Sequence, residues 1–191
     1  MKKVLSLVLA LFLVTGIFGA VAEEKTYDRV MNKFKFGGLS EPGLYLDQTI
    51  MRMCGTHRRL FSQLAQCLIA EGKNDKAIKA LAKMEKEIPE YNVPMDYLSG
   101  GLDLISAYGK VGNKKRATEI ADTLWKTSSQ YMRWYMQDPY YMMISARDCQ
   151  RHLYVMNNII GTMGGIDAKW ASEHEEQFNR LCNAYEQLGG Q

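Results

Sequence analysis

The 191-residue sequence has little proline and no stretch in which apolar and polar residues alternate over a sustained length with enrichment in β-branched residues. Its four prolines are Pro42, Pro89, Pro94 and Pro139, and each stands outside the segments with apolar periodicity rather than within one. The segments between them can form uninterrupted helices, because proline inside a helix removes a hydrogen bond and clashes with the preceding turn. Alternation enriched in β-branched residues is typical of half-buried strands. Its absence favours an all-α fold with essentially no sheet.

Long hydrophobic runs are also missing beyond the N-terminus. Residues 1–22 begin with the positive "MKK", continue with an apolar run and end with "AVA", the pattern of a cleavage site. This order predicts a secretory signal peptide that is cut after Ala22. The alternative is an uncleaved anchor, because Val4 to Ala22 is almost long enough to span a bilayer. With no second such run, we expect a soluble mature protein, in the periplasm of a Gram-negative bacterium or outside the cell.

The sequence also lacks a strong excess of positive or negative charge. The whole chain carries +3, and without Lys2 and Lys3 twenty-two basic side chains stand against twenty-one acidic ones, a net charge of +1. A nucleic-acid-binding protein concentrates positive charge on one face. We therefore expect no nucleic-acid partner.

Cysteine is scarce, with Cys54, Cys67, Cys149 and Cys182 as its four positions. Export permits disulfides, but Cys54 and Cys67 would lie about 20 Å apart on one helix, too far to pair. The alternatives are a Cys149–Cys182 disulfide and four half-buried thiols that pack as small hydrophobic residues. We expect the thiols.

Residues 23–191 suit a single domain. The turn signals Gly37-Gly38 and Pro42-Gly43 predict an irregular lead-in at residues 23–46. Residues 47–191 show the three- and four-residue apolar spacing of helices, interrupted by glycine or proline. We expect about six helices, at residues 47–71, 73–88, 95–108, 114–132, 139–161 and 167–188.

Two segments of the helical region share one spacing pattern. In the first segment, large apolar, small, glycine, alanine and proline residues follow one another in the order of the tetratricopeptide repeat. A shift of 40 residues along the chain gives the second segment, which repeats part of that order. The residues that define the pattern are Phe61, Leu64, Ala65, Gly72, Ala77 and Pro89, then Tyr108, Gly112 and Ala117. Glycine permits a tight turn between antiparallel helices, and alanine permits close helix approach. With a third, degenerate pair at about 139–188, the pattern predicts tetratricopeptide-like antiparallel helix pairs stacked as a short right-handed array.

Five stretches between residues 32 and 97 are similar to a known family: "NKFKFGG", "YLD", "RMCGTHRR", "LIAEGKNDKAIKAL" and "IPEYNVPMDY". They resemble the C-terminal, repeat-containing region of bacterial protein O-mannosyltransferase-like proteins, which are large multi-spanning membrane proteins. The resemblance covers about residues 27–191 and is strongest up to Tyr97. It implies a tetratricopeptide-like domain on the extracytoplasmic side. The family's transmembrane catalytic part has no counterpart in this sequence, so we transfer no activity and expect no enzyme.

Cys54 and His57 lie three residues apart and share a helical face. A structural zinc site needs four ligands, a catalytic one three and a water, and a cysteine nucleophile needs an oriented base. No neighbouring residue completes either set. We therefore expect a packed cysteine and a hydrogen-bonded histidine on an inward stripe from Ile50 to Leu68, with no catalytic residue, metal or cofactor.

The first helix of each tetratricopeptide pair lines the concave face of the array, and there the sequence places Arg59, Ser62, Gln66 and Ser106. Adjacent Arg58 and Arg59 offer guanidinium groups to a carboxylate or phosphate. The function we expect is a non-enzymatic binding or scaffolding module for a protein or peptide. The alternatives are an accessory subunit of a membrane protein glycosyltransferase whose catalytic part is encoded elsewhere, and a solvated face without a ligand.

The segment Tyr131–Met143, "YMRWYMQDPYYMM", is dense in aromatic residues and methionine. Aromatic platforms occur in sugar-binding surfaces, and methionine-rich surfaces can bind several partners. Such residues also dominate protein cores. We expect them to pack between helices around a turn at Pro139.

Overall fold

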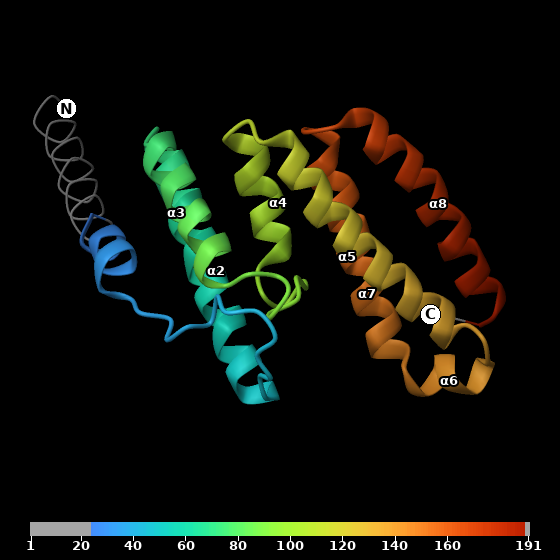
Figure 1. Cartoon of the computed structure of the whole chain (residues 1–191). Helices are drawn as coiled ribbons and strands as arrows, with labels where there is room; N and C mark the ends of the chain where they lie inside the picture. The colour runs from blue at the N-terminus through green and yellow to red at the C-terminus, as the bar shows by residue number, and fades with distance from the viewer. Residues whose placement is uncertain (1–23, 190–191) are drawn as a thin grey trace, which may run out of the picture.

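The computed structural model describes residues 24–189, and all regular structure in this range is helical (Figure 1). The elements are η1 (Arg29–Lys33), α2 (Gln48–Ala70), α3 (Asn74–Glu87), α4 (Gly101–Lys110), α5 (Lys114–Tyr135), α6 (Pro139–Ile144), α7 (Ala146–Gly164) and α8 (Ala168–Gln187). The prediction of an all-α fold is confirmed. The predicted signal peptide at residues 1–22 lies outside the described residues. None of the described helices is both long enough and apolar enough to cross a bilayer.

Gly72 and Gly112 stand at the centres of the connections α2–α3 and α4–α5, each of three residues. Their φ angles of 74° and 82° lie in the left-handed region that favours glycine. In both connections the N–H of the next residue, Lys73 or Asn113, donates to a carbonyl five residues earlier at 2.8 Å. The two turns are therefore built alike. The α7–α8 connection at residues 165–167 also has three residues, but its glycine has a negative φ of −84°.

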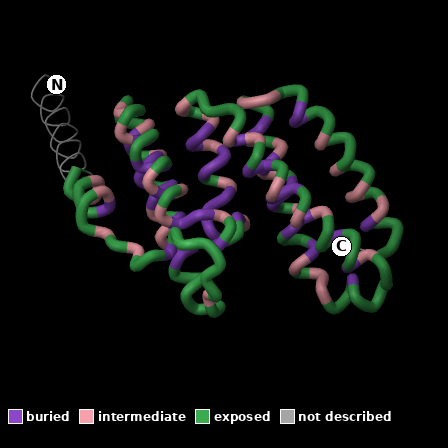
Figure 2. The backbone as a smooth tube through the Cα atoms, in the orientation of Figure 1, coloured by how far each residue is buried: buried purple, intermediate pink, exposed green. Residues whose placement is uncertain are grey.

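Each helix packs against the neighbour that its short connection supplies. Contacts join α2 with α3, α4 with α5, and α7 with α8, while α4 also contacts α2 and α7, and α5 contacts α7. Figure 2 shows the buried residues along the facing sides of these helices. Small side chains let the helices approach closely. The alanines without exposed area are Ala65, Ala77, Ala80, Ala107, Ala117 and Ala121.

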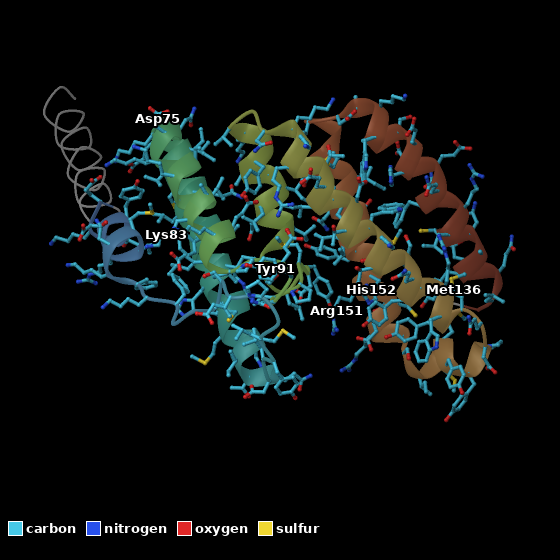
Figure 3. All side chains as sticks on the ribbon, viewed as in Figure 1. Asp75, Lys83, Tyr91, Met136, Arg151 and His152 are labelled. Carbon is cyan, nitrogen blue, oxygen red and sulfur yellow. The ribbon has the colours of Figure 1, made fainter. Side chains whose placement is uncertain are left out.

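The lead-in expected to be irregular at residues 23–46 is helical at 24–33, so that prediction is wrong for its first part. Val30 is buried there, and Lys83 of α3 donates to the Met31 carbonyl at 2.5 Å. Figure 3 shows Lys83 between η1 and α3. We attribute these helical turns to the docking of the segment onto α3. The turn signals at residues 37–43 carry no information about this contact.

Two other helix boundaries differ from the sequence prediction. The third helix begins at Gly101 rather than residue 95, because Asp96 accepts the N–H of Ser99 on its side chain at 2.7 Å and the N–H of Gly101 on its carbonyl at 3.2 Å. These bonds form a turn before α4. The predicted fifth helix is two helices, α6 and α7, with Ser145 between them at φ −106° and ψ 17°.

Large hydrophobic side chains are exposed mainly at one end of the array. Successive helices reverse direction, so the three-residue connections share one end, whereas the start of α2, the α3–α4 connection and α6 share the other, in the lower half of Figure 1. We call this second end the long-connection end. Its exposed large hydrophobic side chains are Leu44, Tyr45, Ile50, Met51, Met53, Tyr91, Leu98, Tyr131, Trp134, Tyr140, Tyr141, Met143, Ile144 and Leu188. Within the described part of the chain only Ile78 and Tyr154 are exposed elsewhere.

Candidate functional site

A groove of about 500 Å³ follows the first half of α2 at the long-connection end, and we call it the α2 groove. Asp47 starts this helix by accepting the N–H groups of Thr49 and Ile50 at 2.7 and 2.9 Å. The opposite wall is the segment 93–99, which leads into α4. The lining residues are Gln48, Met51, Arg52, Gly55, Thr56, Arg59, Val93, Pro94, Asp96, Leu98 and Ser99. The groove therefore combines two guanidinium groups and one carboxylate with apolar walls.

Arg58 holds the wall of the α2 groove in place from inside the protein. Its side chain has no exposed area. The guanidinium donates to the carbonyls of Ile88, Val93 and Pro94 at 3.1, 2.7 and 3.1 Å, and to the Ser99 hydroxyl at 3.3 Å. These acceptors are spread over the α3–α4 connection. Although its place beside Arg59 predicts a surface group, Arg58 is the internal anchor of the connection.

Burial lowers the pKa of Arg58, while Glu90 and Asp96 act in the opposite direction. No carboxylate among residues 24–189 bonds directly to the guanidinium. Neutral carbonyl and hydroxyl oxygens compensate part of its lost hydration, while its buried Nε has no hydrogen-bond partner in this range. The positive charge of Arg58 therefore serves to hold the α3–α4 connection in place. It is not available to a ligand in the α2 groove.

The predicted partner residues Arg59 and Ser62 have different environments. Arg59 is exposed, lines the α2 groove and donates to the Leu98 carbonyl. Ser62 has no exposed area, and its hydroxyl donates to the Arg59 carbonyl at 2.8 Å. A Cβ at Gly100 would lie 3.3 Å from the Ser62 hydroxyl, which shows how closely α4 approaches here. The prediction that Ser62 contacts a partner is wrong, because it lies inside the α2–α4 contact.

Gln66 and Ser106 do not join Arg59 in one groove. The Gln66 amide donates to the Asp103 carbonyl at 3.0 Å and accepts from Lys110 at 3.3 Å, so it links α2 to α4. Ser106 is partly exposed on α4, away from the residues that line the α2 groove. Of the four predicted partner residues, the structure places Arg59 alone in this groove.

Cys54 and His57 lie against the protein interior. Cys54 is buried, and burial raises the pKa of its thiol, which opposes a nucleophilic thiolate. The His57 ring meets Phe34 and Phe36 edge-on, with centroids 5.7 and 5.8 Å apart. The inward stripe begins at Cys54 rather than at Ile50, which is 43% exposed. Within residues 24–189 no three metal-ligating side chains gather at one point.

The residues that define the repeat pattern lie in turns or in the protein interior. Gly72 and Gly112 form the two similar turns described above. The remaining members are buried in the helix contacts: Phe61, Leu64, Ala65, Ala77, Pro89, Tyr108 and Ala117. Cys149 is buried and Cys182 partly exposed, and both are free thiols.

A second depression, of about 320 Å³, lies beyond the turn at residues 96–98, and we call it the tyrosine pocket. It is shared by that turn, by α5 and by α7. The lining residues are Asp96, Tyr97, Leu98, Leu124, Thr127, Ser128, Tyr131, Tyr135, Asp148, Arg151 and His152. Asp96 and Leu98 also line the α2 groove, so the turn forms a ridge between the two sites.

Aromatic rings surround His152 in the tyrosine pocket. Tyr131 stacks on the imidazole with centroids 4.8 Å apart and planes at 13°, and Tyr97 meets it edge-on at 5.9 Å. The His152 Nδ1 lies 3.3 Å from the Ser128 hydroxyl. Burial lowers the pKa of His152, although Asp148 opposes this effect, so the neutral form of the ring is favoured at pH 7.

Arg151 and Asp148 supply the charges of the tyrosine pocket. Arg151 donates to Asp148 at 2.8 Å, and a hydrogen bond with the Tyr97 side chain raises the pKa of Arg151. Burial and the nearby Asp148 carboxylate raise the pKa of Tyr135. Figure 3 shows Arg151 and His152 in the region between α4 and α5. Tyr131 and Tyr135 belong to the aromatic segment noted in the sequence, whereas Tyr97, Asp148 and Arg151 come from two other segments and have no sequence signal that joins them to it.

The segment Tyr131–Met143 is divided between core and surface. Met132, Tyr135 and Met142 are buried, as expected for packing between helices. The exposed members include Trp134, whose ring stacks on Tyr141 at 5.8 Å. Packing around Pro139 therefore accounts for part of the aromatic density only.

No protein-family model, no curated protein and no solved structure matches this chain. The resemblance to the repeat region of O-mannosyltransferase-like proteins stays a prediction.

Proposed function

We propose that this chain is an exported, non-enzymatic helical module that binds a protein or peptide at its long-connection end. In this proposal the helix pairs form a short right-handed array of the tetratricopeptide type. The similar turns at Gly72 and Gly112 support the repeat, because each joins a helix pair through the same left-handed glycine geometry.

The α2 groove is the observation that carries the proposal. It opens among exposed apolar side chains, including Met51 and Leu98, which are 37% and 60% exposed. Exposed apolar surface next to a preformed depression is typical of interaction sites. The opposite end of the array, by contrast, presents polar residues such as Asp75 and Lys115.

The chemistry of the α2 groove favours an extended peptide segment with an acidic side chain. Arg52 and Arg59 give two positive charges against the single Asp96. A guanidinium binds a carboxylate through paired hydrogen bonds, and the apolar walls accept neighbouring hydrophobic side chains. Because Arg58 anchors the opposite wall from inside, the groove is formed before the partner arrives.

Site-specific photocrosslinking in the host cells tests this proposal. A benzophenone amino acid at Met51, in the α2 groove, is expected to capture a discrete protein or peptide. The matched control carries the same group at Lys79, which is exposed on α3. Equal capture from both positions would contradict the proposal. If the captured species is a multi-spanning glycosyltransferase, the chain is its accessory subunit.

Charge reversal in the α2 groove gives a quantitative test with the captured partner. We expect Arg52→Glu combined with Arg59→Glu to weaken binding about tenfold or more, because two attractive contacts become repulsive. The matched control reverses Lys79 and Lys126, which are exposed outside the groove. Titration calorimetry measures both affinities, and an unchanged affinity of the groove variant would rule out this surface.

A further inference from the structure

The tyrosine pocket has a chemistry that the proposed protein binding does not use. Three phenol rings, from Tyr97, Tyr131 and Tyr135, line a space of about 320 Å³. Asp148 and Arg151 line the same space. Aromatic rings and planar polar groups therefore meet in one small depression.

We propose that the tyrosine pocket binds a neutral sugar ring. A pyranose has an apolar face of C–H groups, which packs on an aromatic ring, and a rim of hydroxyl groups, each of which can donate and accept hydrogen bonds. The pocket offers the side chain of Tyr131, a residue that is 47% exposed, to the apolar face. It offers Asp148 as an acceptor and Arg151 as a donor to the rim.

The charge of the lining argues against ionic ligands. Asp96 and Asp148 stand against Arg151, and His152 is neutral, so an anion meets a net negative lining. A cation is repelled by the positive guanidinium of Arg151, which Asp148 holds in place. A neutral polyol avoids both conflicts while using the same polar groups as hydrogen-bond partners.

The size of the pocket limits the ligand to about one ring. Ligand sites generally measure about 300–1,000 Å³, and this pocket lies at the lower bound. A dinucleotide or a folded peptide segment does not fit such a space. A monosaccharide unit does, with its neighbours in a chain extending into solvent.

The polar groups of the tyrosine pocket are held in place without a ligand. Asp148 and Arg151 are three residues apart on α7 and bonded at 2.8 Å. His152 is fixed by stacking on Tyr131 and by its contact with Ser128 at 3.3 Å. A prearranged lining of this kind reduces the ordering cost of binding. The inference is independent of the proposed protein binding, because the α2 groove lies on the other side of the 96–98 turn.

Saturation-transfer NMR with the purified protein tests the inference. The probes are the methyl glycosides of glucose, galactose, mannose, fucose and N-acetylglucosamine, with choline and inorganic phosphate as charged comparisons. We expect saturation of the ring protons of at least one glycoside at millimolar concentration. Tyr131→Ala and Asp148→Asn, each tested singly, are expected to weaken that binding about tenfold. The matched control is Tyr154→Ala, an exposed tyrosine of α7 outside the pocket, which should leave binding unchanged.

Three results would overturn the inference. Absence of saturation for every glycoside excludes a sugar site. Glycoside binding that persists in both Tyr131→Ala and Asp148→Asn places the sugar elsewhere. Binding of choline or phosphate in place of the glycosides assigns the pocket to an ion. Circular dichroism of each variant verifies that the fold is kept, and Asp148→Asn leaves the aromatic packing intact if Tyr131→Ala disturbs it.

Discussion

At the scale of single residues, adjacent Arg58 and Arg59 have opposite environments. Arg58 is fully buried, whereas Arg59 is exposed in the α2 groove. The helical period explains the difference, because Arg58 stands four residues after Cys54 and three before Phe61, on the apolar stripe. The same count, applied to the sequence, would have identified Arg58 as an internal residue.

Replacing Arg58 tests its role as the anchor of the α3–α4 connection. We expect Arg58→Met to lower the free energy of unfolding by about 3 kcal/mol, because the carbonyls of Ile88, Val93 and Pro94 lose a charged donor. Urea unfolding measures the loss. Arg59→Met, at the exposed neighbour, should cost less than about 1 kcal/mol. An equal loss of unfolding free energy in Arg58→Met and Arg59→Met would contradict the role of Arg58 as a buried anchor.

His152 should make stability depend on pH. Its pKa in the folded state is lowered by burial, so the unfolded chain binds a proton first as pH falls. The contribution of His152 to the free energy of unfolding is therefore constant above the ordinary histidine pKa of 6.5 and falls below it, by at most about 1.4 kcal/mol per pH unit. Urea unfolding at about pH 7.5 and about pH 5.5 measures the change. His152→Gln should reduce it, and an identical pH dependence in that variant would refute the assignment.

At the scale of elements, glycine decides how closely α4 approaches its neighbours. A Cβ at Gly101 would lie 2.8 Å from the Asp96 carbonyl and 2.9 Å from Leu124. Gly100, one residue earlier, packs against Arg59. The apolar periodicity predicts a helix over these residues. It carries no sign of the side-chain turn at Asp96 or of the contacts from α2 and α5.

A pair of glycine-to-alanine substitutions tests this close packing. Gly101→Ala should lower the free energy of unfolding by about 1–3 kcal/mol, because its Cβ overlaps the Asp96 carbonyl and Leu124. Gly161→Ala, within exposed α7 surface where no atom lies within 4 Å, should raise it by about 0.5–1 kcal/mol. Thermal unfolding by circular dichroism compares the two. Stabilisation by both substitutions would contradict the packing at the start of α4.

At the scale of the whole molecule, the helices form a row in which the central members have more neighbours than the outer ones. α4 contacts α2, α5 and α7, whereas the extensive packing of α8 is against α7. The buried residues of α8 are Trp170, Ala171 and Tyr185. Trp170 ties its start to α5 through a hydrogen bond to Asp122 at 2.7 Å. Stability should consequently vary along the row.

Hydrogen exchange should reveal this gradient. We expect amides of α8 to exchange about tenfold faster than those of α5, a helix of similar length with more neighbours. Mass spectrometry of peptides from the two helices measures the rates. Trp170→Phe should widen the difference, because it removes the bond to Asp122. Equal protection of α5 and α8 would indicate one cooperative unit and contradict the expected gradient.

The sequence by itself determined the local features of this protein. The all-α class and the turns at Gly72 and Gly112 follow from apolar spacing and from a glycine with positive φ, and both depend on residues within a few positions of one another. The predicted inward stripe from Ile50 to Leu68 is local in the same sense, although the structure starts it at Cys54.

Only the tertiary structure decided which side chains meet across the chain. Arg58 reaches Pro94 over 36 positions, Ser62 lies inside the α2–α4 contact, and the tyrosine pocket joins Tyr97 to α5 and α7. The physical reason is that a helical period tells which residues share a face but not which neighbour covers that face. Packing makes that choice, and with it the position of both candidate sites.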